Sequence, residues 1–180
     1  MLDSEVVVLI GFMGAGKTTV GRELARMLNR SFYDLDPLIE ARAGKSIASL
    51  FAEQGEAAFR KLESQSLREL LESFEDELAV IALGGGAFAQ ETNRQLIRDH
   101  SLTVVFLDVA LDEALRRCAS APGARPLMSA PEQATLLYEE RLPFYRTAQC
   151  TVQTGGKTVP GIAQEIVSLL QLTPSDQEVE

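Results

Sequence analysis

The sequence predicts an α/β fold of three layers, with helices on both faces of a five-stranded parallel sheet. Five short runs of apolar and β-branched residues alternate along the 180 residues with segments whose apolar positions recur at helical spacing. Two of these runs, at residues 78–83 and 102–108, are apolar at nearly every position, which is typical of parallel strands buried on both faces. Because parallel neighbours require crossover connections, the intervening helices should form right-handed crossovers.

The first half of the chain opens with a strand, a glycine-rich loop and a helix. Residues 5–10 are mostly aliphatic, and apolar residues recur at helical spacing from Lys17 to about Asn29. We then expect a strand at 31–35, a helix with Asp36 as its N-cap and Pro37 in its first turn, a helix that begins at Ser46 and is interrupted at Gly55, and a long helix from Glu56 to about Phe74.

The second half continues the alternation. We expect strands at 78–83, 102–108 and 149–153, and helices at 91–99, 111–119, 132–145 and 159–172. Residues 120–131, SAPGARPLMSAP, contain three prolines and a glycine without core periodicity, which favours a mobile lid. We therefore expect a single domain over residues 1–172, with the lid at about 120–131 and a disordered acidic tail at 173–180.

Residues 11–18, GFMGAGKT, match the phosphate-binding pattern G-x-x-x-x-G-K-[ST] between the first strand and the first helix, which is the context this motif requires. Glycines let the loop point its backbone N–H groups at phosphates, and the helix N-terminus adds its positive end. Lys17 supplies a charge for the β- and γ-phosphates, and the Thr18 hydroxyl can ligate Mg²⁺. We expect a nucleoside triphosphate site formed by Gly14, Ala15, Gly16, Lys17, Thr18 and Thr19.

Other polar groups follow the second and third strands at the same edge of the predicted sheet, where ligands of such folds bind. Asp34 can hold Mg²⁺ through water, lie near an attacking hydroxyl, or be only a solvated strand end. Asp36 can reach a second substrate or serve only as a helix cap. The consecutive Gly84, Gly85 and Gly86 favour close approach of a ligand to the backbone.

Three arginines outside the phosphate loop are candidate anion ligands. Arg60, on the long helix, can bind an anion or form a surface ion pair with Glu63. Arg125 lies in the proline-rich segment and can swing in with a lid to stabilise charge that develops in phosphoryl transfer. Arg141 directly precedes Leu142-Pro143 and is either a helix-end residue or an anion ligand.

The composition of the chain limits the classes of partner that it is expected to bind. The net charge of −9 argues against a nucleic-acid surface, although arginines can make a pocket locally positive. No apolar run approaches the roughly 20 residues that span a bilayer, and the N-terminus lacks the basic segment of a signal peptide. Cys118 and Cys150 match no metal spacing, so we expect free thiols in a reducing cytoplasm. We expect a cytoplasmic monomer without nucleic-acid or membrane partners.

Six segments together resemble the shikimate kinase family: GFMGAGKTTVGRELA, FYDLDPLIE, GKSIASLFAEQGEAAFRKLE, LGGGA, ARPLM and EERLPFY. The P-loop alone is shared with many unrelated proteins, whereas D-x-D, F-R-x-x-E, G-G-G, R-P-L and R-x-P-x-Y in this order are far more specific. The resemblance covers residues 5–170 and implies a P-loop kinase fold. It also implies ATP-dependent phosphorylation of the 3-hydroxyl of shikimate, in aromatic amino-acid biosynthesis.

The resemblance further implies roles by position. Arg60 and Arg141 would bind the shikimate carboxylate and Asp36 the ring hydroxyls, with Gly84, Gly85 and Gly86 completing the substrate site. Lys17 and Arg125 would stabilise the transferring phosphoryl group, Thr18 would ligate Mg²⁺ with help from Asp34, and Arg117, or as second choice Arg116, would stack on adenine. Asp34 could instead act near the attacking hydroxyl.

Two other functions remain open at the level of the sequence. A kinase for another small polyol, such as gluconate, would share the P-loop and the lid, but would not need the D-x-D, F-R-x-x-E and triple-glycine set together. A GTP-dependent switch would usually carry N-K-x-D and D-x-x-G stretches, and the sequence contains neither.

Overall fold

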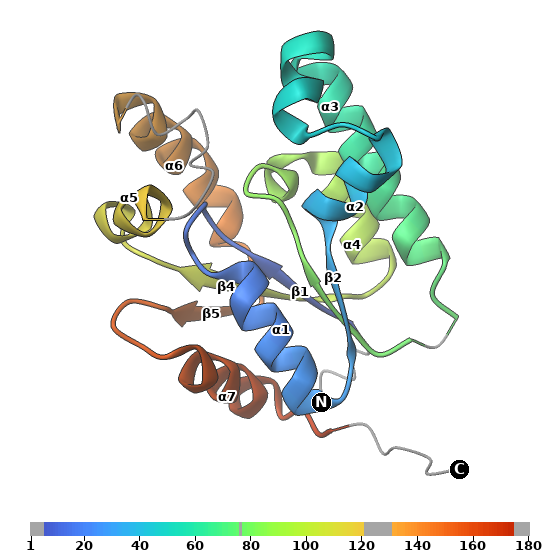
Figure 1. The fold of residues 1–180 in the computed structure, drawn as a ribbon. Coiled ribbons are helices and arrows are strands. Elements are labelled where there is room, and N and C mark those ends of the chain that lie inside the picture. Colours follow the sequence, from blue (N-terminus) through green and yellow to red (C-terminus); the bar gives the residue numbers. More distant parts are fainter. Residues whose placement is uncertain (1–5, 76, 121–130, 175–180) are drawn as a thin grey trace.

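The structure, a computed structural model, describes residues 6–75, 77–120 and 131–174 (Figure 1). These ranges hold five strands, seven helices and one 3₁₀ turn. The elements are β1 (Val6–Ile10), α1 (Lys17–Leu28), β2 (Ser31–Asp34), α2 (Leu35–Ala43), α3 (Ile47–Glu72), β3 (Ala79–Ala82), η1 (Ala87–Ala89), α4 (Glu91–Asp99), β4 (Thr103–Asp108), α5 (Leu111–Ala119), α6 (Pro131–Tyr145), β5 (Cys150–Gln153) and α7 (Val159–Leu170).

The five strands form one parallel sheet, as predicted, and their order in the sheet is β2-β3-β1-β4-β5. β1 lies at its centre, where Val8 is aligned with Ile81 of β3 on one side and with Val104 of β4 on the other. Ala82 of β3 is aligned with both Leu9 of β1 and Asp34 of β2. Only β3 therefore separates Asp34 from β1, the strand that leads into the phosphate loop.

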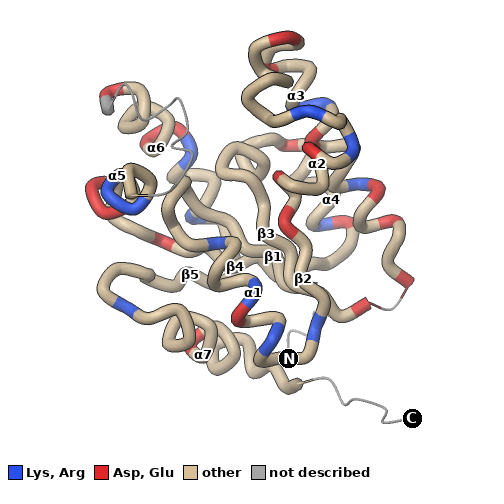
Figure 2. The backbone as a smooth tube through the Cα atoms, viewed as in Figure 1, with Lys and Arg blue, Asp and Glu red and all other residues tan. Residues whose placement is uncertain are grey.

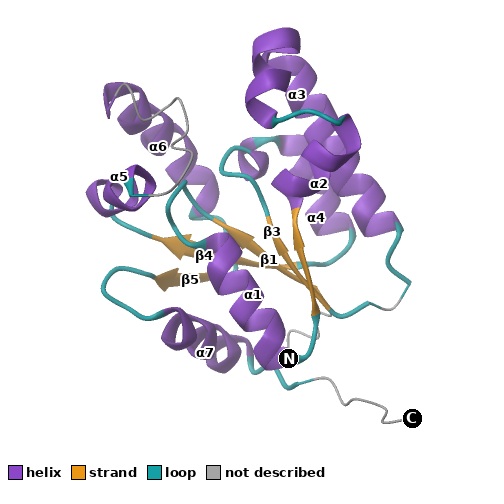
Figure 3. Cartoon of the chain, viewed as in Figure 1, coloured by secondary structure: helices purple, strands orange, loops and turns teal. Residues whose placement is uncertain are grey.

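Helices cover both faces of the sheet, and loops emerge from its edges (Figure 3). α1 and α7 pack side by side on one face, whereas α3 and α4 pack together on the other and α6 contacts η1 (Figure 1). Every residue of β1 and β3 is buried. Figure 2 shows these central strands free of charged residues, which gather on helices and loops. Charged side chains that could act on a ligand must therefore lie outside these central strands, at the ends of strands, on helices or in loops.

The start of α2 differs from the expectation. Its N-cap is Asp34, whose side chain accepts a hydrogen bond from the backbone N–H of Asp36 at 3.3 Å. The prediction that Asp36 caps this helix was wrong, because β2 passes directly into α2 without a linker, so the last strand residue is also the cap. Asp36 lies inside the first helical turn together with Pro37.

The long helix α3 agrees with the sequence-based expectation. Ser46 caps α3 by accepting from the Ser49 N–H, and Gly55 leaves the helical path with φ 78° and ψ 172°, which confirms the predicted interruption. The short turn η1 was not expected. Residues 121–130 of the predicted lid, with Arg125, and residues 175–180 of the predicted tail lie outside the described residues.

Candidate active site

The phosphate loop joins β1 to α1 and packs its backbone against α5. Gly14 has φ +74°, and a Cβ there would lie 2.5 Å from the Ala114 carbonyl oxygen, so glycine is required at this position. Gly16, at φ 92°, is the N-cap of α1, and no side chain in the described part of the chain caps this helix. An N-terminus of this kind, with its positive end toward the loop, favours binding of an anion.

Lys17 and Thr18 lie at the start of α1. Lys17 Nζ donates to the carbonyl oxygens of Gly11 at 2.9 Å and Phe12 at 3.0 Å, so its ammonium group lies against the loop. Thr18 Oγ1 donates to Asp34 Oδ2 at 2.6 Å, which joins the loop to the end of β2. The two residues predicted to serve Mg²⁺ therefore lie within hydrogen-bonding distance of each other.

The Thr18 hydroxyl and the Asp34 carboxylate suit Mg²⁺, which prefers oxygen ligands. Mg²⁺ is commonly held by one or two carboxylates together with substrate phosphates, rather than by an all-protein cage. Within residues 6–75, 77–120 and 131–174 no group of three or more His, Cys, Asp or Glu residues could hold a metal ion. The hydroxyl and carboxylate beside a phosphate loop therefore fit an ion that reaches the site with a nucleotide.

The two candidate adenine arginines of α5 lie in different surroundings. Arg117 Nη1 donates to the carbonyl oxygen of Gly14 at 3.2 Å, and its Nη2 donates to Glu113 Oε1 at 2.5 Å and to the Thr154 carbonyl oxygen at 3.1 Å. The Arg116 side chain is 73% exposed and pairs with Asp112 on its own helix. Arg117 is therefore the arginine that adjoins the phosphate loop.

The three glycines after β3 are surrounded by the predicted substrate ligands. A Cβ on Gly84 would lie 2.6 Å from Asp36 Oδ1, so any larger residue would displace that carboxylate. A Cβ on Gly85 would lie 3.4 Å from Arg141 Nη1, and Gly86 lies against the Arg60 guanidinium. Asp36 from α2, Arg60 from α3 and Arg141 from α6 thus meet at one glycine segment, hereafter the acceptor loop (Gly84, Gly85 and Gly86).

The acceptor loop also adjoins the phosphate loop. A Cβ on Gly85 would lie 3.7 Å from both the Gly11 carbonyl oxygen and the Met13 nitrogen. The alignment of β3 beside β1 explains this proximity, because parallel neighbours release their following loops at the same edge of the sheet. A molecule bound at the acceptor loop would therefore lie next to the groups expected to hold phosphates.

Glu63 gives the acceptor site a buried carboxylate. Its side chain is 1% exposed, and its Oε2 accepts from Arg60 Nη1 at 2.8 Å. Burial raises the pKa of Glu63, and nearby Asp36 raises it further, whereas the charge and hydrogen bond of Arg60 oppose the rise. The Arg60–Glu63 pair predicted as a surface alternative is present, but it is not on the surface, because Glu63 lies on the same apolar stripe as Phe59 and Leu67.

Tyr145 of α6 holds the acceptor loop through a hydrogen bond to its backbone. Its hydroxyl donates to the Gly85 carbonyl oxygen, and its ring stacks on Phe106 of β4 with centroids 5.2 Å apart. Burial raises the pKa of Tyr145 to about 12, against the opposing effect of Arg141. The phenol therefore remains a hydrogen-bond donor at neutral pH, and it holds the loop at Gly85, where a Cβ would lie 3.4 Å from Arg141 Nη1.

Sequence reasoning placed most of these groups and missed three. Asp36, Arg60, Arg141 and the acceptor loop come together as expected, as do Lys17, Thr18 and Asp34. Glu63, Tyr145 and Thr154 were not assigned to the site. Helical spacing carried a signal for two of them, since Glu63 is one turn from Phe59 and Tyr145 one turn from Arg141. Thr154 had no such signal.

Comparison with known proteins identifies the family of this chain. A family model described as shikimate kinase matches residues 13–171. This chain belongs to the shikimate kinase family. The shikimate kinase of Salinispora arenicola is 44% identical over 168 residues, covering 92% of this chain and 97% of that protein. The shikimate kinase of Rhodococcus jostii is 38% identical over 167 residues, covering 91% of this chain and 96% of its own length.

Solved structures agree with this family assignment. Shikimate kinase from Acinetobacter baumannii in complex with shikimate is 35% identical, has a TM-score of 0.85, and each chain covers 94% of the other. A gluconokinase from Sinorhizobium meliloti also aligns, with a TM-score of 0.64 over 92% of this chain and 91% of that one. At 18% identity this second likeness shows the fold alone. The P-loop kinase fold of the shikimate kinases is therefore the fold of this chain.

Proposed function

We propose that this family member transfers the γ-phosphoryl group of ATP to the 3-hydroxyl of shikimate, forming shikimate 3-phosphate in aromatic amino-acid biosynthesis. The observation that carries the proposal is the acceptor loop, where Asp36, Arg60 and Arg141 meet beside the phosphate loop. Two cations and a hydroxyl-binding carboxylate around bare backbone suit a small polyhydroxy acid. The shikimate kinase relatives supply the identity of that acid.

In the proposed complex Arg60 and Arg141 bind the substrate carboxylate from two helices. Guanidinium groups offer paired donors that match a carboxylate, so together they fix the orientation of the ring. Asp36 accepts hydrogen bonds from ring hydroxyls, while Gly84, Gly85 and Gly86 allow the ring to lie close to the backbone. Glu63 holds Arg60 in place, because its Oε2 accepts from Arg60 Nη1. This arrangement directs a hydroxyl toward the phosphate loop.

Residues of the phosphate loop would carry the nucleotide side of the reaction. Backbone N–H groups from Gly14, Ala15 and Gly16 to Thr19 bind phosphates, and Lys17 moves from its loop carbonyls to the β- and γ-phosphates. Arg125, which lies outside the described residues, is proposed to add a second cation at the transferring group. Arg117 is proposed to lie against the adenine, since it already adjoins Gly14.

Thr18 and Asp34 are proposed to hold Mg²⁺, which when bound would neutralise phosphate charge. Both Asp34 oxygens are engaged in the structure, one by Thr18 and one by the Asp36 N–H. These two hydrogen bonds hold the Asp34 carboxylate beside Thr18, where it can serve Mg²⁺ or lie near the attacking hydroxyl.

The proposal also covers the setting of the enzyme. We propose a monomer in the cytoplasm without nucleic-acid or membrane partners. Cys118 and Cys150 are free thiols, as a reducing compartment allows. Among the described residues, no helix is both long enough and apolar enough to cross a bilayer.

A substrate panel tests the proposal against the nearest alternative. Purified protein is mixed with ATP and Mg²⁺ and offered shikimate or gluconate, and ADP release is followed with a coupled assay. We expect ADP release with shikimate, with one phosphoryl group added per molecule by mass spectrometry, and none above background with gluconate. Turnover of gluconate with no turnover of shikimate would overturn the proposal.

A further inference from the structure

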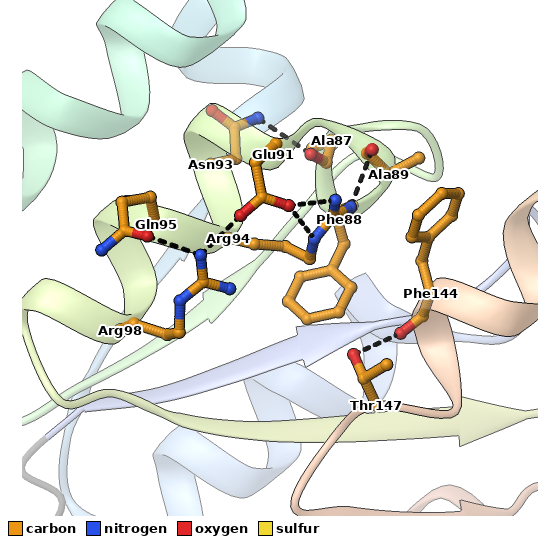
Figure 4. Close-up of polar contacts among 10 residues, drawn as sticks. All are labelled: Ala87, Phe88, Ala89, Glu91, Asn93, Arg94, Gln95, Arg98, Phe144 and Thr147. Carbon is orange, nitrogen blue, oxygen red and sulfur yellow. Dashed lines mark hydrogen bonds and ion pairs between the residues drawn. The ribbon is translucent and has the colours of Figure 1, made fainter.

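The short turn η1 directly follows the acceptor loop, and residues of α4 bind its carbonyl groups. Asn93 Nδ2 donates to the Ala87 carbonyl oxygen at 2.9 Å, and Asn93 is fully buried. Arg94 Nη1 donates to the carbonyl oxygens of both Phe88 and Ala89 at 2.8 Å (Figure 4). Within the turn the Gln90 N–H also donates to the Ala87 carbonyl oxygen at 3.2 Å. Asn93 and Arg94 add side-chain hydrogen bonds to all three carbonyls of η1, and these bonds fix its path.

Arg94 makes two further contacts with the rest of its guanidinium group. Its Nε and Nη2 donate to Glu91 Oε2 at 3.1 and 2.5 Å, and its plane lies over the Phe144 ring of α6, with the central carbon 4.5 Å from the ring centroid. The side chain is 13% exposed. Only a planar cation with several fixed donors can make edge contacts to carbonyls and a carboxylate while its face covers an aromatic ring.

Arg94 thereby joins the two supports of the acceptor loop. One support is η1, which continues the chain from Gly86. The other is α6, which carries Arg141 and also Tyr145, the donor to the Gly85 carbonyl oxygen. The acceptor loop is held from α6 at Gly85 and from α4 just beyond Gly86, and the Arg94–Phe144 contact couples the two helices.

The geometry points to Arg94 as a positioning residue for the phosphoryl acceptor. It touches no proposed substrate atom, but it sets the distance between the acceptor loop and the helix that bears Arg141. This inference rests on the proposed acceptor site. Its consequence is specific: loss of the guanidinium should impair binding of the acid substrate and leave nucleotide binding at the phosphate loop intact.

Arg98 offers a matched control on the same helix. It also pairs with Glu91, through Nη2 to Oε1 at 2.5 Å, and it donates to Gln95. Its side chain is 53% exposed, and in the described part of the chain no hydrogen bond or ion pair joins it to η1 or α6. Substitution of Arg98 removes the same charge and the same carboxylate partner without touching either support.

The test compares Arg94→Lys and Arg94→Met with Arg98→Lys and Arg98→Met in the full-length protein, by steady-state kinetics with shikimate and ATP varied in turn. We expect both Arg94 variants to raise KM for shikimate about tenfold or more with KM for ATP within about twofold, since each loses a charged hydrogen-bond donor fork. Lysine should not rescue, because an ammonium cannot reproduce the fork. Both Arg98 variants should match the wild type.

Either of two results would overturn the inference: Arg94 variants with unchanged KM for shikimate, or equal increases in both KM values, which indicate general loss of structure. If the Arg94 variants do not fold, Phe144→Leu removes only the ring beneath the guanidinium, and it should raise KM for shikimate alone; an unchanged value would count against the inference. Failure of the proposed function is distinct, because the wild type itself would then not use shikimate.

Discussion

The phosphate loop and the acceptor loop lie side by side, yet they are built in opposite ways. The phosphate loop is a run of consecutive residues whose shape depends on its own glycines. The groups proposed to bind phosphates are its backbone N–H groups and Lys17, which also lies in this run. The acceptor site draws Asp36, Arg60, Gly85 and Arg141 from four separate segments of the chain. Its geometry therefore depends on long-range packing and on buried side-chain contacts such as Arg60–Glu63.

This difference predicts how each site fails. A change in the phosphate loop should abolish chemistry without altering how the acid substrate is recognised. A change among the acceptor residues should weaken the acid substrate while the nucleotide still binds. The acceptor site also contains two buried ionisable groups, Glu63 and Tyr145, whose pKa values are raised. A change in their protonation should affect the acceptor site rather than the phosphate loop.

The largest effect is expected for Lys17→Met. Methionine is unbranched and only one atom shorter than lysine, but it removes the charge directed at the transferring group, so kcat should fall about a thousandfold or more. Circular dichroism and thermal unfolding should show a folded protein, and shikimate binding measured by calorimetry should persist. Near-normal turnover in a folded Lys17→Met protein would contradict the phosphate-loop assignment.

The next effect separates the two substrates. Arg60→Ala and Arg141→Ala should each weaken shikimate binding by on the order of 2–4 kcal/mol, about thirty- to a thousandfold in kcat/KM for shikimate, with ATP affinity nearly unchanged. Because Arg60→Ala also leaves Glu63 buried without its cation, the double variant Arg60→Ala/Glu63→Gln should recover stability but not shikimate affinity.

Arg42→Ala is the control for this pair of substitutions. Arg42 makes a surface ion pair with Glu69, so its loss should change stability by less than about 1 kcal/mol and leave both substrates unaffected. Wild-type shikimate kinetics in both site variants would show that the carboxylate pocket is misplaced.

The smallest effect is a pH dependence that belongs to the acceptor side. Tyrosine in an unfolded chain has a pKa of about 10, whereas burial raises the pKa of Tyr145 to about 12. The unfolded state therefore loses this proton first, and the stability associated with the neutral phenol is present below about pH 10 and lost as the pH rises toward 12. Urea unfolding at several pH values should show this decline, with a shallower slope in Tyr145→Phe.

Tyr33 provides the comparison for this measurement. Its pKa is also raised, mainly by its hydrogen bond to Glu77, but it lies away from the acceptor loop. Tyr33→Phe should likewise flatten the alkaline decline in stability, yet only Tyr145→Phe should raise KM for shikimate at neutral pH. An equal effect of both substitutions on KM would argue against support of Gly85 by Tyr145.

The sequence allowed the sheet and its helices to be predicted, because period and length in each segment agree with the final packing. It also allowed the phosphate loop to be found, since eight consecutive residues specify it. The direct passage of β2 into α2 was not predictable from propensity, and so the cap was assigned to Asp36 rather than to Asp34. The local sequence does not indicate which strand passes into the next helix without a linker.

The acceptor site was predictable only in part. Strand ends and the family resemblance placed Asp36, Arg60 and Arg141 together, and the structure agrees. The burial of Glu63, the bond from Tyr145 to Gly85 and the path of η1 depend on contacts between segments far apart in the chain. Charged residues such as Glu63 are ordinarily exposed, so pattern reasoning assigned this carboxylate to the surface.

The central place of β1 in the sheet has a consequence for changing what this protein phosphorylates. The strand that carries the phosphate loop has β3 on one side and β4 on the other, and Asp36, Arg60 and the acceptor loop all come from the β2–β3 side. Substitutions that redesign the acceptor can thus be confined to α2, α3, the acceptor loop and the end of α6. The phosphate loop and α5 would then remain unchanged while variants of the acceptor site are selected for other alcohol substrates.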